Sequence, residues 1–219
     1  MDLYEAIYSR RDVREYRADD VSDEVLARIL DAAHHAGSVG FMQPWNFTVV
    51  RSAETRQRIA ASSCKENQRA AENYTGQRRE LYESLRLDAI ENSAVNLAVT
   101  CDRDRNGPHV LGRNTMPDTD VYSTCCAIQN MWLAACAEGI GMCWLSIIDP
   151  EVVKAELRVP EHIVLVAYLC LGVPVEFLDR PMLEKVGWQS RSALTDVVYS
   201  EQWQQTWNPT TKSSASNSA

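Results

Sequence analysis

The sequence predicts an α+β fold in which helices outnumber strands. One segment, His162–Gly172, is almost continuously apolar, as expected for a strand inside a covered sheet. Another, Tyr122–Glu138, places apolar residues almost all round a helix, which indicates burial on more than one side and points to a subunit interface. With 219 residues, of which 45% are hydrophobic, the chain has the size and composition of one globular domain.

The first fifty residues predict two helices, a loop and a strand. Leu3–Arg10 has the pattern of a short helix. Ser22 is expected to cap a second helix, because its hydroxyl can accept a bond from the first turn and the acidic residues that follow favour the positive end of the dipole. Residues 34–44 form a loop with two glycines, and Asn46–Arg51 is the first predicted strand.

The middle of the chain changes character twice. Ser52–Ile90 is charged and poor in large apolar residues, which predicts exposed helices with a flexible middle. Val95–Cys101 is the next predicted strand. Asp102–Thr119 contains turn formers and little periodicity, which predicts a long loop, and loops of that length in compact domains are often functional. We therefore expect a lid within residues 52–119.

The last third predicts short elements and a tail. Gly139 ends the apolar helix, and Met142–Ile148 is a predicted strand. Asp149 followed by Pro150 indicates the start of a short helix, because Pro suits the first helical position. We expect one domain over residues 1–207 and a disordered polar tail over 208–219.

Bulk properties exclude several classes of protein. The formal net charge of -8 argues against a nucleic-acid surface. The charged N-terminus does not resemble a secretory leader, and the longest apolar run, Ile163–Val173, is shorter than the roughly 18 residues of a spanning helix. Seven Cys without a CxxC pair and only four His predict neither a disulfide framework nor a metal site. A cytoplasmic protein is expected.

The most informative stretch is Arg10-Arg11-Asp12-Val13-Arg14, in which three guanidinium groups flank one carboxylate. Arginine side chains are planar forks of donors that match phosphate oxygens and stay charged at any physiological pH. The stretch is therefore a candidate phosphate clamp. The alternative is a solvated, charged helix end.

Four segments in this order resemble the FMN-dependent nitroreductase superfamily. They are Arg10–Arg14, Ser38–Phe47, the helix from Tyr122 with the following Gly139–Ile147, and Gly187-Trp188 with Arg191. Within that superfamily they are similar to the BluB branch, the 5,6-dimethylbenzimidazole synthases. The marks of this branch are Asp12 in place of a small hydroxyl residue, the uninterrupted Met42-Gln43-Pro44-Trp45, and Trp144-Leu145-Ser146. Gly37, Cys143 and Gln204 depart from the usual pattern.

The resemblance implies a nitroreductase-like three-layer α/β/α sandwich with a central, mostly antiparallel sheet, in an intertwined homodimer with FMN at the interface. It implies that reduced FMN, supplied by a flavin reductase, reacts with O2 and is fragmented to 5,6-dimethylbenzimidazole, the lower ligand of cobalamin. One alternative is an NAD(P)H-dependent nitroreductase or dehalogenase that retains its FMN. Another is a non-catalytic flavin-binding protein.

The resemblance also implies roles for individual residues. Ser146 is expected to hydrogen-bond the flavin N5, although a serine at a strand end is often only a capping residue. Asp12, expected to be ionised among arginines, either accepts protons during flavin breakdown or only positions the arginines. Trp45 and Phe47 are expected to fill the core. The implied FMN-binding residues are Arg10, Arg11, Asp12, Val13, Arg14, Ser38, Gly40, Met42, Gln43, Ser146 and Arg191.

Overall fold

The computed structural model describes residues 1–207 in two units, one over Met1–Pro181 and a second that begins at Met182. The first unit holds the sheet, the helices α1–α6 and the 3-10 helix η1, and the second holds the short helices α7 (Met182–Lys185) and η2 (Leu194–Asp196). The expected tail at 208–219 lies outside the described residues. No helix in the described part of the chain is long and apolar enough to cross a membrane.

A four-stranded antiparallel sheet forms the centre of the first unit. Its strands are β1 (Trp45–Val50), β2 (Val95–Cys101), β3 (Gly141–Leu145) and β4 (Val164–Gly172). Their order in the sheet is β1-β2-β4-β3, and every neighbouring pair is antiparallel. The predicted antiparallel sheet is therefore confirmed, with β1 and β3 at its two edges.

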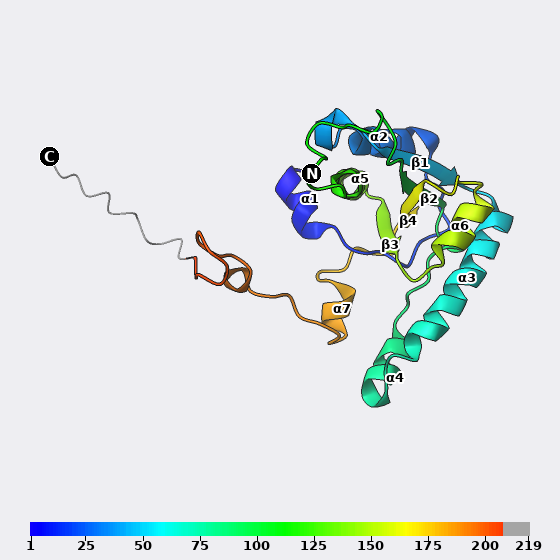
Figure 1. The fold of residues 1–219 in the computed structure, drawn as a ribbon. Helices are drawn as coiled ribbons and strands as arrows, with labels where there is room; N and C mark the ends of the chain where they lie inside the picture. Colours follow the sequence, from blue (N-terminus) through cyan, green and yellow to red (C-terminus); the bar gives the residue numbers. More distant parts are fainter. Residues whose placement is uncertain (208–219) are drawn as a thin grey trace. The chain divides into compact units, whose positions relative to one another are not determined.

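Helices cover both faces of this sheet. On one face lie α2 (Asp23–His34) and α5 (Thr119–Ala137), and on the other lie α3 (Ala53–Ala71) and α6 (Pro150–Glu156) (Figure 1). The alternation along β2 explains the two cores, because Leu97 packs toward α2 and α5 while Ala98 packs toward α3 and α6. The predicted α+β fold with three layers is confirmed.

Local capping determines where several helices begin. Asp2 and Glu5 form a capping box at α1 (Leu3–Ser9). At α2 the predicted cap is confirmed, since Ser22 Oγ accepts the Val25 N–H at 3.3 Å. Asp149 caps α6 with Pro at its first position, as the sequence predicts.

Three sequence predictions need correction. The helix α5 begins at Thr119, earlier than predicted. Its Tyr122 is 54% exposed in the single chain, so burial of that side in a subunit interface stays a prediction. The strand β3 ends at Leu145 instead of Ile148, because the Ile147 carbonyl accepts a bond from Ser63 Oγ of α3 at 2.8 Å rather than from a strand. The region 52–90 does contain two helices, α3 and α4 (Gly76–Ser84), but Ile59 of α3 is fully buried.

Candidate functional site

The arginine-rich N-terminal segment lies along the β3 edge of the sheet. Asp12 forms a parallel bridge with Met142, and the Val13 N–H donates to the Met142 carbonyl at 3.1 Å. The close pass requires a glycine, because a Cβ on Gly141 would lie 2.7 Å from Val13 Cγ1. Val13 is buried, so its side chain packs against the sheet. The segment thereby covers an edge that would otherwise be unpaired.

Asp12 uses both carboxylate oxygens in contacts within the chain. Its Oδ1 accepts the Trp144 N–H at 3.3 Å, and its Oδ2 accepts Arg14 Nε at 2.7 Å. The carboxylate therefore ties an arginine to the strand that leads into Ser146. This geometry suits a positioning role, and the 38% exposure of the side chain leaves it accessible to a ligand as well.

The three arginines have different surroundings. The Arg14 guanidinium is mostly buried and donates to Asp12 and to the Leu87 carbonyl. Burial opposes its charge, but the facing Asp12 carboxylate raises the pKa of Arg14 on balance. Arg11 donates to the Tyr8 carbonyl at 2.7 Å, which lies at the end of α1, and to the Asp179 carbonyl at 2.6 Å.

Donors that remain unused at this edge fit a phosphate. Arg11 Nε is buried without a hydrogen-bond partner within residues 1–207. Arg10 stacks over the Trp132 ring at 4.6 Å, which leaves the edge of its guanidinium fork open to an anion. Arg56 Nε is also buried without a partner elsewhere in the described chain, so the orphaned donor alone does not mark a site. What distinguishes Arg11 is its place in the Arg10–Arg14 segment, which the sequence predicts to bind phosphate.

Ser146 follows β3 directly and is exposed. It stands two residues after Trp144, whose N–H binds Asp12. The structure therefore groups Asp12, the arginine segment and Ser146 along one edge strand. A contact of Ser146 with a flavin stays a prediction.

The second predicted set of residues leads into β1 and has an unusual backbone. It contains the short 3-10 helix η1 (Val39–Phe41), and φ is positive at Gly40 (52°), Phe41 (54°) and Gln43 (50°). Gly40 is required, because a Cβ there would lie 2.7 Å from the Leu111 carbonyl oxygen. The Ser38 hydroxyl is already bound, since it accepts the Gln43 N–H at 3.0 Å.

The neighbouring residues of this set pack into the interior, and Arg191 lies elsewhere in the chain. The Met42 side chain is 1% exposed, so it packs into the interior of the single chain. Trp45 is buried and Phe47 packs against the same core, which confirms that both aromatic residues fill the core. Arg191 lies in the second unit, in a stretch without regular structure between α7 and η2.

The structure does not bring the two sets together in one chain. The arginine segment and Ser146 belong to the β3 edge, whereas Ser38–Gln43 leads into β1 at the opposite edge. Because neighbouring strands are antiparallel, β3 runs toward the end of the sheet where β1 begins. Three strand spacings still separate the two edge strands, which is roughly 14 Å.

The loop between β2 and α5 contains residues that sequence reasoning missed. Arg105 donates to the carbonyls of Gln43 and Trp45, at 2.5 and 2.9 Å. No motif marked Arg105, and the only available signal was the expectation that this long loop is functional.

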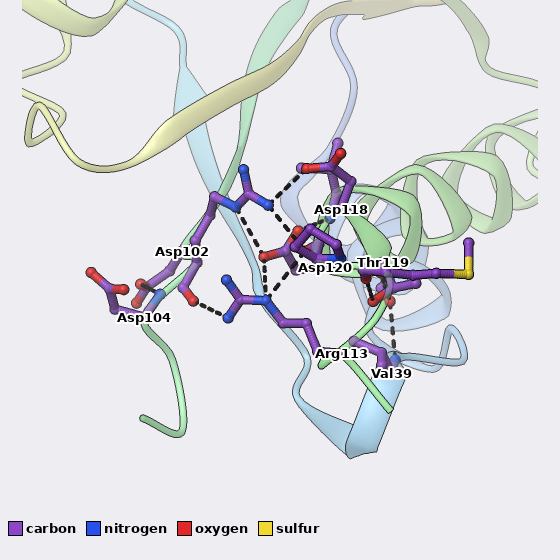
Figure 2. Close-up of polar contacts among 12 residues, drawn as sticks. Val39, Asp102, Asp104, Arg113, Asp118, Thr119 and Asp120 are labelled. Atoms are coloured by element: carbon purple, nitrogen blue, oxygen red, sulfur yellow. Dashed lines mark hydrogen bonds and ion pairs between the residues drawn. The ribbon is translucent and has the colours of Figure 1, made fainter. Parts of the chain in front are cut away.

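The same loop is tied to the start of α5. Arg103 Nε and Arg113 Nε each lie 3.1 Å from Oδ2 of the fully buried Asp120 (Figure 2). Two guanidinium groups on one buried carboxylate compensate its burial and hold the loop against the helix.

Comparison with known proteins shows the family to which this chain belongs. The model of the Nitroreductase family matches residues 7–173, which is most of the chain. The chain belongs to the nitroreductase family. This agrees with the antiparallel three-layer fold and with an arginine cluster at the sheet edge.

The relatives narrow the class further. The 5,6-dimethylbenzimidazole synthase of Rhodospirillum rubrum is 42% identical over 182 residues, covering 83% of this chain and 86% of the relative. That of Rhodobacter capsulatus is 38% identical, over 85% of this chain and 90% of the relative. Among solved structures, a BluB-like flavoprotein from Clostridium difficile has a TM-score of 0.68 at 23% identity, covering 92% of this chain and 100% of the other. Iodotyrosine deiodinase bound to FMN and 3-iodo-L-tyrosine has a TM-score of 0.68 at 20% identity, over 81% and 92% of the two chains.

Proposed function

We propose that this chain catalyses the formation of 5,6-dimethylbenzimidazole from reduced FMN and molecular oxygen. The observation that carries the proposal is the placement of Asp12. It lies between arginines and bonds to the strand that leads into Ser146, in a chain 42% identical to a relative of that activity. FMN is supported by the family and by the FMN-bound neighbour, whereas oxygen as the second substrate is part of the proposal.

The arginine segment would bind the flavin phosphate. Arg10 and the orphaned Nε of Arg11 offer donors that no group within residues 1–207 is seen to accept, and a phosphate dianion would accept them. Arg14 lies deeper and already contacts Asp12, so it would add positive charge more than new hydrogen bonds. Arg191 is proposed to close the phosphate site. Val13 contributes by packing the segment against Gly141.

Asp12 and Ser146 would serve the chemistry. Bound reduced FMN supplies both the electrons for oxygen and the carbon atoms of the product. The Ser146 hydroxyl can donate a hydrogen bond to a ring nitrogen or accept one, as the redox state requires. Asp12 can hold a proton only by weakening its bond to Trp144 or Arg14, so its two candidate roles are distinguishable.

We further propose a homodimer that shares each flavin site between two chains. The arginine segment and Ser38–Gln43 belong to opposite edges of one sheet, and a second copy can supply the missing set. The exposed side of α5, with Tyr122 and Cys126, is the surface proposed for this contact. In this assembly Ser38, Gly40, Met42 and Gln43 line the flavin ring.

The decisive experiment is aerobic incubation of the purified protein with chemically reduced FMN, followed by mass analysis of the flavin products. We expect loss of FMN with formation of 5,6-dimethylbenzimidazole, and only reoxidised FMN without the protein. Chemical reduction makes the proposed flavin reductase unnecessary, and adding a reductase tests that partner separately. Many turnovers of reduced nicotinamide with FMN retained would instead indicate an ordinary nitroreductase. Tight FMN binding with neither activity would indicate a non-catalytic flavoprotein.

A further inference from the structure

The segment that leads into β1 is held in a conformation that it would not adopt alone. Phe41 and Gln43 both have φ near +50°, in the left-handed region that residues with a side chain rarely occupy. Such residues cost free energy and persist only when the surrounding structure holds them in place. Some other part of the chain must therefore supply the restraint.

The restraint is a run of hydrogen bonds from one short stretch of the loop after β2. Asn106 Nδ2 donates to the Met42 carbonyl at 3.3 Å, and Arg105 Nη1 donates to the Gln43 and Trp45 carbonyls. Between them, the Asp102 N–H donates to the Pro44 carbonyl at 2.8 Å. Consecutive carbonyls from Met42 to Trp45 therefore all accept bonds from residues 102–106.

Arg105 is the centre of this contact. Besides the two carbonyls, its guanidinium donates to Asn46 Oδ1 and lies 3.8 Å from Asp102 Oδ2 through Nε. A planar fork that reaches several acceptors at once restricts the peptide planes of Gln43 and Trp45 more tightly than a single bond would. On the other side, Gln43 is restrained by the bond of its N–H to Ser38 Oγ at 3.0 Å.

We propose that Arg105, assisted by Asn106, is a positioning residue that holds Ser38–Gln43 in the geometry that a flavin ring requires. The inference rests on the proposed function for the identity of the ligand. Arg105 would not touch the flavin itself, because its donors are committed to the segment and to Asn46. The phosphate clamp belongs to the other edge of the sheet and should not depend on Arg105. Loss of Arg105 should therefore change the orientation of the flavin ring more than it changes the affinity for FMN.

The experiment compares Arg105→Gln and Arg105→Lys with Asp104→Asn as the control from the same loop. Asp104 is exposed and precedes Arg105 directly, and Asn at this position keeps the backbone bonds to Asp102 and Gly107. The first measurement is visible circular dichroism of bound oxidised FMN, together with its dissociation constant. The second is the yield of 5,6-dimethylbenzimidazole per reduced FMN oxidised in air.

For Arg105→Gln we expect an altered dichroism of the flavin, a dissociation constant within about threefold of the wild type, and a product yield lower by at least about tenfold, since small misplacements of reacting groups are costly. Arg105→Lys should recover part of the yield, because one donor remains. The control should match the wild type in all three measurements. Unchanged dichroism and yield in Arg105→Gln, or an equal loss in Asp104→Asn, would overturn the proposal.

Two provisions keep the test decisive. If Arg105→Gln does not fold, Asn106→Gly removes the bond to the Met42 carbonyl, suits the positive φ of 66° at this position, and should change the dichroism in the same direction. An unchanged spectrum there would count against the proposal. If the wild type makes no 5,6-dimethylbenzimidazole but binds FMN, the proposed function fails, while the dichroism still tests the role of Arg105.

Discussion

At the β3 edge of the sheet the Arg10–Arg14 segment pairs directly with a strand, whereas at the β1 edge Ser38–Gln43 is held by a loop 62 residues further along the chain. The first contact uses backbone bonds and one carboxylate, and none of residues 10–14 has a positive φ. The second uses an arginine fork to maintain residues at positive φ. Both edges carry residues predicted to contact one flavin.

The two edges should therefore respond differently to mutation. At the β3 edge one side chain, Asp12, bonds both Arg14 and the Trp144 N–H, so changing it removes both a charge and a strand contact. At the β1 edge the restraint is distributed over carbonyls from Met42 to Trp45, so partial losses should be graded. We expect abrupt effects from mutations at the first edge and graded effects at the second.

The largest effect is expected from Asp12. In Asp12→Ala we expect product formation from reduced FMN to fall by about a hundredfold or more, which is the usual contribution of a proton-transferring group. Asp12→Asn keeps an acceptor for the Trp144 N–H but loses the charge facing Arg14. An equal loss in both variants supports proton transfer, whereas near-normal activity in Asp12→Asn would mean that Asp12 only positions its neighbours. The exposed Asp19→Asn is the control for removal of a surface charge.

A mixed-dimer experiment tests whether the two edges meet across subunits. Asp12→Ala impairs the β3 edge, and Gly40→Val impairs the β1 edge, because its side chain would collide with the Leu111 carbonyl and Val110. Each homodimer should be inactive. Co-expressed, differently tagged chains should yield heterodimers with about half of the wild-type activity, since one of two shared sites is intact. If the heterodimers remain inactive, each flavin site lies within one chain.

A smaller effect, on stability, is expected at the β3 edge from Tyr16. Its partly buried hydroxyl lies 2.5 Å from the Val13 carbonyl oxygen and 3.0 Å from the Cys170 carbonyl oxygen, and its one proton can be donated to either. Tyr16→Phe leaves these carbonyls without that donor, which should cost about 1–3 kcal/mol in urea unfolding. The control Tyr4→Phe, at an exposed tyrosine, should leave the free energy of unfolding almost unchanged.

The pH dependence of this effect has a defined sign. Burial, with the nearby Cys143 thiol, raises the pKa of Tyr16 well above its ordinary value in the folded protein. The unfolded chain ionises this phenol near pH 10, so ionisation stabilises only the unfolded state there. The advantage of Tyr16 over Phe is therefore complete below about pH 10 and declines as the pH rises further. A difference that grows above pH 10 would contradict the assigned environment.

Local rules were sufficient for much of the fold. The strand β2 has the predicted bounds, and Ser22 caps α2 as expected, because both depend on residues close in sequence. The early end of β3 could not be predicted, since it depends on Ser63 of α3 taking the Ile147 carbonyl. What covers the exposed side of α5 could not be predicted for a related reason: apolar composition does not say whether the neighbour is the same chain or another.

The sequence by itself determined the helices, the strands and the arginine-rich motif that pointed to the family, since hydrophobic period, capping residues and neighbouring charges are all read over short distances. Only the tertiary structure decided that this motif lies on the β3 edge and that residues 102–106 hold the backbone before β1. Contacts between distant segments depend on how the whole chain closes around its sheet, which no local pattern encodes.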